Sequence, residues 1–125
     1  MTFGIIGSGA FGTALSISLS STNKKLILWT RNQDVVNSVQ EIRENQLRLP
    51  GYILPQNIIV TNDINQMENC SIILIAVPMQ QLRSVVELHR SRLEGKILVA
   101  CCKGFEVSTG SVSYTHLTLP TTIEV

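Results

Sequence analysis

The chain has 125 residues, 44% of them hydrophobic and 15% charged, a composition that suits one folded domain with a single core. Its formal net charge of +1 offers no strong attraction to nucleic acid or to an anionic membrane surface, so we expect neither as a partner. No apolar run reaches the roughly 20 residues that span a bilayer. The N-terminus also lacks the pattern of a signal peptide, so we expect a cytoplasmic protein.

The first predicted unit is a strand, a glycine-rich turn and a helix. Residues 3–6 form an apolar strand and residues 13–19 can form a helix, with Gly7, Gly9 and Gly12 between them at the G-x-G-x-x-G spacing. In such a turn the first glycine lets the chain leave the strand, the second lets a pyrophosphate approach the backbone, and the third lets the helix pack closely. The N–H groups at the helix N-terminus favour phosphate, so this unit predicts a dinucleotide site.

The next elements complete a βαβ unit. Residues 26–29 are apolar on both faces, as expected for a parallel strand covered by helices. The apolar side chains of residues 33–43 recur at helical spacing. We expect residues 47–56 to be irregular, because two prolines and a glycine interrupt any regular element there.

The other half of the sheet is predicted from three further apolar segments. The strands lie at residues 58–61, 71–77 and 97–101, with a short helix at 63–69 and a longer one at 80–93 between them. The alternation predicts an α/β fold with a doubly wound parallel (Rossmann) sheet of strand order 3-2-1-4-5. Ligands of such sheets bind beyond the carboxyl ends of the strands, where the order reverses.

The cysteines give no sign of a disulfide framework or a metal site. Their number is odd, no secretory signal precedes them, and Cys101 and Cys102 are adjacent. We expect these two and Cys70 to be small, mostly buried apolar residues, and we expect no metal.

The end of the second strand indicates which dinucleotide is bound. A typical NAD site has a carboxylate there that hydrogen-bonds the ribose 2′-OH. This chain has Thr30, Arg31 and Asn32 instead, and Asp34 lies beyond the strand end. Because an arginine can pair bidentately with a 2′-phosphate, we expect NADP(H) to be preferred, with NAD(H) possible. The alternative is a solvated Arg31 that contacts no ligand.

Five segments form a more specific combination. They are GIIGSGAFGTAL at 4–15, LILWTRN at 26–32, ENQLRLPGYILPQNI at 44–58, ILIAVPMQQLR at 73–83 and CCKGFEVSTG at 101–110. Together and in this order they resemble the bacterial type of NAD(P)-dependent glycerol-3-phosphate dehydrogenase. The resemblance implies reversible hydride transfer between NAD(P)H and dihydroxyacetone phosphate, giving sn-glycerol 3-phosphate for phospholipid synthesis. It also implies that the complete enzyme is a homodimer.

The resemblance also assigns site residues by position. Ala10 and Phe11 would contact the cofactor from the turn, and Arg31 its adenosine end. Lys103 would lie near both nicotinamide and substrate, where a lysine can bind an anion or polarise an oxygen; its alternative is a solvated loop lysine. Pro78, directly after the fourth strand, is placed to shape a loop above the sheet. The predicted cofactor-binding residues are Gly7, Ser8, Gly9, Ala10, Phe11, Gly12, Arg31, Pro78 and Lys103, and Lys103 is also the predicted substrate-binding residue.

The chain departs from the family pattern at two positions. Arg48 stands where an aromatic residue is frequent, before the LP of the LPG loop. Met79 stands where a small polar residue is common, after the VP that ends the fourth strand.

The end of the chain departs further. The resemblance covers residues 1–112, part of a nucleotide-binding domain, whereas 113–125 (SYTHLTLPTTIEV) resembles a translated sequencing adapter. We therefore expect 113–125 to be artefactual. The family's catalytic lysine and substrate domain lie beyond the chain end, so we expect weak dinucleotide binding and no turnover by these 125 residues alone. We expect no catalytic role for His89 or His116.

Two other functions fit part of the pattern. Another NADP-dependent dehydrogenase, such as a ketopantoate reductase, shares the glycine turn and the strand-end arginine, but we would not expect the LPG loop or the KG-x-E-x-x-T-G segment in it. A non-catalytic dinucleotide-sensing module would have about this length, but it would need a natural C-terminus and an interface.

Overall fold

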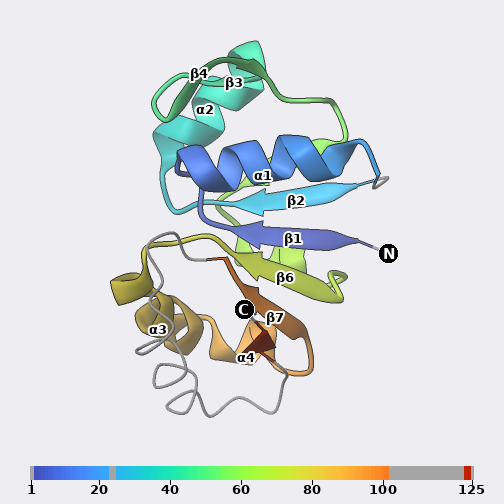
Figure 1. Cartoon of the computed structure of the whole chain (residues 1–125), viewed down its shortest axis with the longest axis vertical. Helices are drawn as coiled ribbons and strands as arrows, with labels where there is room; N and C mark the ends of the chain where they lie inside the picture. The colour runs from blue at the N-terminus through green and yellow to red at the C-terminus, as the bar shows by residue number, and fades with distance from the viewer. Residues whose placement is uncertain (1, 23–24, 102–122, 125) are drawn as a thin grey trace.

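The computed structural model describes residues 2–22 and 25–101 and the backbone of residues 123–124. These residues form a parallel sheet with helices on both faces and a separate antiparallel hairpin (Figure 1). The strands of the sheet are β1 (Phe3–Ile6), β2 (Leu26–Trp29), β5 (Ile58–Thr61), β6 (Ile72–Ile75), β7 (Ile97–Ala100) and β8 (Ile123–Glu124). The helices are α1 (Ala10–Ser20), α2 (Gln33–Ile42), α3 (Met79–Leu88) and α4 (Arg90–Leu93), with a 3-10 helix η1 (Ile64–Met67). None of these helices is long and apolar enough to cross a membrane.

The strand order is β5-β2-β1-β6-β7-β8. Its first five members confirm the predicted order 3-2-1-4-5. The order reverses between β1 and β6, which lie side by side although β2 and β5 come between them in the chain. Ile6, the last residue of β1, pairs with Trp29 on one side and with Ile75 on the other. The three central strands therefore end level with one another, at the edge where a doubly wound sheet binds its ligands.

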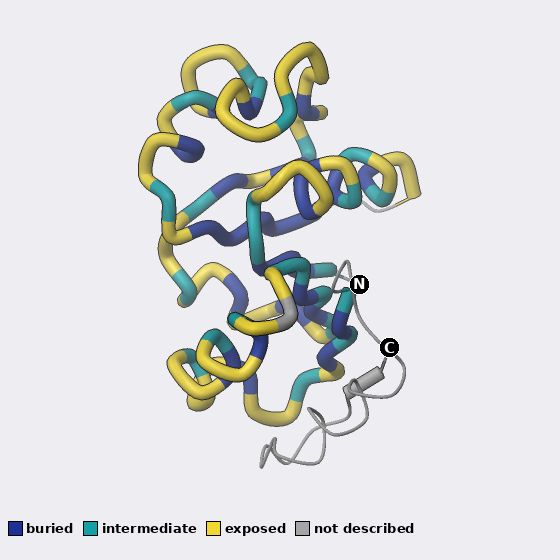
Figure 2. Tube along the Cα trace, turned by 60° about the vertical axis from the view of Figure 1, so that its left-hand side comes forward, coloured by how far each residue is buried: buried dark blue, intermediate teal, exposed yellow. Residues whose placement is uncertain are grey.

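Alternate residues of the strands supply two apolar cores, one on each face of the sheet. Ile5 and Leu28 pack under α1 and α2 in one core, while their neighbours Ile6 and Ile27 pack against η1, α3 and α4 in the other. Because both faces are covered, the central strands are apolar throughout, as the sequence predicted. Figure 2 shows the result along the trace, with buried central strands and exposed outer turns.

The segment expected to be irregular contains a strand, and that expectation was wrong. β4 (Leu49–Ile53) pairs with β3 (Glu44–Asn45) in an antiparallel hairpin beside α1 and α2 (Figure 1). Pro50 is tolerated because a strand with a free edge has no ladder partner for the missing N–H on that side. Gly51 takes a positive φ of 89°, which glycine adopts without strain.

Three further boundaries differ from the prediction. The helix expected at 80–93 is broken at His89, whose backbone leaves the helical region (φ −107°, ψ 21°) while its ring turns toward Trp29. α1 begins at Ala10, directly after its N-cap Gly9, so Gly12 lies inside the helix rather than before it. The sheet does not end with the strand at 97–101, because β8 pairs with β7 and satisfies backbone groups of an otherwise open edge.

Candidate functional site

The three glycines of the turn have three different environments. Gly7 has a positive φ of 115°, and a Cβ there would lie 2.6 Å from the carbonyl oxygen of Ala76. A Cβ on Gly12 would collide with the carbonyl oxygen of Gly7, so only glycine lets α1 approach the end of β1 this closely. A Cβ on Gly9 would meet nothing within 4 Å. The backbone is thus tightly packed at Gly7 and Gly12 and open above Gly9, as the G-x-G-x-x-G spacing predicts.

A small hydrogen-bond network fixes the glycine turn, which we define as residues 7–9. The Ser8 hydroxyl donates to Thr30 Oγ1 at 2.6 Å, which ties the turn to the end of β2. The carbonyl of Ser8 accepts from Asn45 Nδ2 at 2.9 Å and from Thr13 Oγ1 at 3.2 Å. Asn45 is fully buried, and its Nδ2 also donates to Thr13 Oγ1 at 2.9 Å. The turn is therefore held by β2, by α1 and by the hairpin.

A crevice of about 420 Å³ opens at the carboxyl ends of β1, β2 and β6. Its wall consists of the glycine turn, residues 29–32 at the end of β2, Arg48 of the hairpin, residues 76–78 after β6 and one side of α3 with His89. We call this the strand-end crevice. It lies at the reversal of strand order, which is the position predicted for a ligand.

The strand-end crevice is positively charged. Its described lining contains Arg31 and Arg48 and no Asp or Glu. Within the described part of the chain, neither guanidinium forms an ion pair or a side-chain hydrogen bond. The first turn of α1 has no acidic residue, and its N-cap Gly9 supplies no side-chain acceptor. Two free arginines thus line a cavity that adjoins Gly9, the N-cap of α1, an arrangement that suits a phosphorylated ligand.

The structure brings most of the predicted cofactor residues together. Gly7, Ser8, Gly9, Arg31 and Pro78 line the crevice. Three others belong to the first turn of α1 without lining it: Ala10 and Phe11 are exposed there, and Gly12 is buried beneath Gly7. Lys103 lies outside the described residues, as do Cys102 and His116.

Two residues that matter to the site were not predicted as contributors. Arg48 drew attention only as a departure from the family pattern. Asn45 carried no signal, because an asparagine between a predicted helix and a segment expected to be irregular is ordinarily exposed. Only the docking of the hairpin beside α1 shows that Asn45 is buried and that Arg48 reaches the crevice.

The apolar wall of the crevice holds an unusual pair of rings. Trp29 and His89 pack edge to face, with ring centroids 4.7 Å apart and an interplanar angle of 73°. Trp29 Nε1 and His89 Nε2 are both buried and have no hydrogen-bond partner among the described residues. Burial lowers the pKa of His89, because the charged imidazolium loses hydration there. Burial in this wall therefore favours the neutral ring over the charged one.

The two cysteines that the structure describes are free thiols, Cys70 buried and Cys101 half-buried. Burial raises the pKa of both and so disfavours the reactive thiolate. In the described part of the chain, His, Cys, Asp and Glu side chains do not gather in any group of three that could hold a metal ion.

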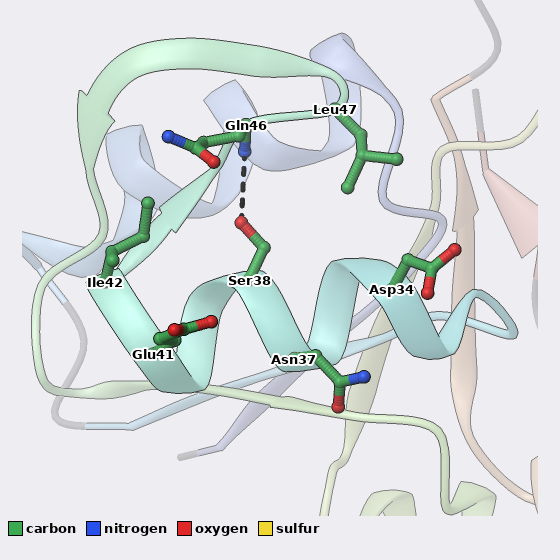
Figure 3. A pocket seen from close by; sticks show the side chains of 7 residues that line it. All are labelled: Asp34, Asn37, Ser38, Glu41, Ile42, Gln46 and Leu47. Carbon is green, nitrogen blue, oxygen red and sulfur yellow. Dashed lines mark hydrogen bonds between the residues drawn. The ribbon is translucent and has the colours of Figure 1, made fainter.

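A second hollow, between α2 and the hairpin, has the opposite character (Figure 3). Its wall includes the carboxylates of Asp34 and Glu41 and the hydroxyl of Ser38. Ser38 Oγ accepts a hydrogen bond from the backbone N–H of Gln46 at 3.3 Å (Figure 3). With two carboxylates and no cation, this hollow does not suit a phosphate.

Comparisons with known proteins agree with this geometry. A family model described as the N-terminus of NAD-dependent glycerol-3-phosphate dehydrogenase matches residues 2–121. Two curated relatives, both named glycerol-3-phosphate dehydrogenase (NAD(P)+), are 46% identical (Ruegeria sp.) and 44% identical (Roseobacter denitrificans) over 110 residues. Each match covers 88% of this chain and 34% of the relative, so the chain spans about a third of their length.

A solved structure shows the same fold. The crystal structure of glycerol-3-phosphate dehydrogenase from Coxiella burnetii matches with a TM-score of 0.82 at 24% identity, over 98% of this chain and 38% of that one. The family match also includes residues 113–121, which the sequence assigned to an artefactual segment. The boundary at residue 112 stays a prediction.

Proposed function

This chain belongs to the NAD-dependent glycerol-3-phosphate dehydrogenase family, and on that premise we propose that its strand-end crevice binds NADP(H) in preference to NAD(H). The observation that carries the proposal is the charge of the crevice. Two unpaired arginines line it, and no carboxylate among the described lining residues is available to accept the ribose 2′-OH of NAD(H). A 2′-phosphate would neutralise the arginines, whereas a 2′-hydroxyl would leave them uncompensated.

The residues present fit a dinucleotide. The open face of Gly9 leaves room for a pyrophosphate against the N-terminus of α1, where the N–H groups and the helix dipole favour negative charge. Arg31, directly after β2, would hold the adenosine end. Apolar side chains after β6 and on α3, among them Val77 and Val85, would cover the adenine and exclude water from it. The bound nicotinamide would supply or accept the hydride.

We further propose that the complete protein interconverts dihydroxyacetone phosphate and sn-glycerol 3-phosphate and supplies phospholipid synthesis. The names of the relatives support the reaction. Lys103 is the candidate of this chain for contact with both nicotinamide and substrate. We propose a cytoplasmic homodimer for the complete protein, and no turnover by the 125 residues alone.

Of the two alternative functions, that of a ketopantoate reductase is disfavoured by the family match. A sensing module would be favoured by a dimer of this chain that binds nucleotide tightly without substrate.

The test is a nucleotide titration of the 125-residue chain. Trp29 is the only tryptophan and lines the crevice, so its fluorescence reports binding. We expect tighter binding of NADPH than of NADH, and a roughly 10- to 100-fold loss of NADPH affinity in Arg31→Ala, since a charge-assisted bidentate contact is removed. Arg83→Ala is the matched control, because Arg83 is exposed on α3 and outside the crevice. Equal loss of NADPH and NADH affinity in Arg31→Ala, or no loss, would refute the preference.

A further inference from the structure

Arg48 is the second cation of the strand-end crevice and comes from a different part of the fold than Arg31. It lies between β3 and β4, in the hairpin, whereas Arg31 follows β2. Its side chain is exposed and, within the described part of the chain, has no ion-pair or hydrogen-bond partner. The hairpin therefore brings a free guanidinium to a cavity that already holds one.

The backbone of Arg48 is held in place. Its N–H donates to both the backbone oxygen and the side-chain Oδ1 of Asn45, each at 3.3 Å. The Nδ2 of the same asparagine donates to the carbonyl of Ser8. One buried side chain thus connects Arg48 directly to the glycine turn.

The other side of the hairpin is held by α2. The hydroxyl of Ser38 donates to the carbonyl of Glu44 at 2.6 Å. It also accepts from the N–H of Gln46, the bond drawn in Figure 3. The position of Arg48 is therefore set by contacts with two helices and the turn rather than by a free loop.

We propose that Arg48 and Arg31 together hold the 2′-phosphate of NADP(H), which makes Arg48 a specificity-determining residue. This inference rests on the proposed NADP(H) function. A phosphate monoester has three terminal oxygens and a charge between −1 and −2 near neutral pH. A single guanidinium therefore leaves at least one oxygen without a donor and part of the negative charge without a counter-charge. The pyrophosphate already has the N-terminus of α1 and the open face of Gly9. The 2′-phosphate is the remaining anionic group, and Arg31 and Arg48 are the arginines of the described lining.

The experiment compares two pairs of ligands that differ only by the 2′-phosphate. These are NADPH with NADH, and adenosine 2′,5′-bisphosphate with AMP, titrated calorimetrically into the 125-residue chain and its variants. In Arg48→Ala we expect a roughly 10- to 100-fold loss of affinity for NADPH and the bisphosphate, with NADH and AMP within about twofold of wild type. Arg48→Lys keeps the charge and should recover part of the loss. Arg83→Ala should change none of the four.

Each other outcome counts against the inference. An equal loss on both members of a pair would place Arg48 at the pyrophosphate or adenine, and no loss on any ligand would remove it from the site. A third outcome is that Arg31→Ala loses affinity only for the ligands that carry a 2′-phosphate while Arg48→Ala loses affinity for none of the four. In that case the inference about Arg48 fails while the proposed NADP(H) function stands. If wild type does not bind NADPH more tightly than NADH, both fail. Unchanged circular dichroism and unfolding midpoint in Arg48→Ala exclude misfolding, which the exposed, unpaired side chain gives no reason to expect.

Discussion

Replacing Asn45 by alanine tests whether the hairpin shapes the nucleotide site. The substitution removes two donated hydrogen bonds of 2.9 Å, to the Ser8 carbonyl and the Thr13 hydroxyl, and one accepted from the N–H of Arg48 at 3.3 Å. It leaves the outer surface of the hairpin unchanged, because Asn45 is fully buried.

The magnitude follows from what each partner retains. The Ser8 carbonyl still accepts from Thr13 Oγ1, and the Arg48 N–H still reaches the backbone oxygen of Asn45, so neither is left without a partner. Two well-formed bonds at a net ~1 kcal/mol each give about 2 kcal/mol. The void left by the amide adds ~1 kcal/mol, so we expect Asn45→Ala to lower the free energy of unfolding by about 3 kcal/mol.

The assay is urea unfolding of the 125-residue chain followed by far-ultraviolet circular dichroism, together with the nucleotide titrations. Because a loosened glycine turn weakens every phosphate contact, affinities for NADPH and NADH should fall by the same factor, unlike the selective loss expected in Arg48→Ala. Asn37→Ala, on the exposed face of α2, is the matched control. A change in unfolding free energy below about 0.5 kcal/mol, the ordinary range for a surface substitution, would refute the structural role of Asn45.

Two further predictions concern the turn and the apolar wall. Gly12→Ala should lower the unfolding midpoint sharply, because its Cβ collides with the Gly7 carbonyl. Gly9→Ala should unfold like wild type but bind NADPH and NADH more weakly, because its Cβ enters the space left for the pyrophosphate. Equal unfolding midpoints for the two variants would contradict this prediction. The folded chain should lose stability as pH falls below the ordinary His89 pKa of 6.5, because burial lowers this pKa and the unfolded chain takes up the proton first. His89→Phe should remove that part of the pH dependence in denaturation curves, and an unchanged dependence would show that His89 is not its source.

The sequence predicts those features that follow from local pattern. Gly7, Gly9 and Gly12 stand between an apolar strand and a helix, and this spacing is enough to predict the turn. The alternation of apolar strands and helices is enough to predict the sheet order and the edge where the ligand binds. The position of Arg31 follows in the same way, because it comes directly after β2. Five strands of the parallel sheet (β5, β2, β1, β6 and β7) were therefore predicted in the correct order without any knowledge of packing.

The features that the sequence did not predict depend on how distant segments of the chain are arranged. Asn45 lies 37 residues from Ser8 in the chain, and no local pattern shows that the two meet. Pro50 was taken to prevent a strand, because proline lacks the ladder donor, but one free edge of the hairpin needs none. At the break in the helix, the ring of His89 packs against Trp29, which lies 60 residues earlier. None of these arrangements can be seen in the local sequence pattern.

The bond between Asn45 and Ser8 has a consequence for how the nucleotide site forms as the chain folds. The strand, turn and first helix are local in sequence and can assemble early, and the turn also bonds to Thr30 at the end of β2. The bond from Asn45 to Ser8 forms only after α2 and the hairpin have docked, which closes a loop of 37 residues. Local opening of the hairpin therefore removes one of the contacts that hold the turn, together with Arg48 from the crevice wall. By mass action, a bound dinucleotide should suppress that opening and slow hydrogen exchange at the N–H of Arg48, a residue outside the glycine motif.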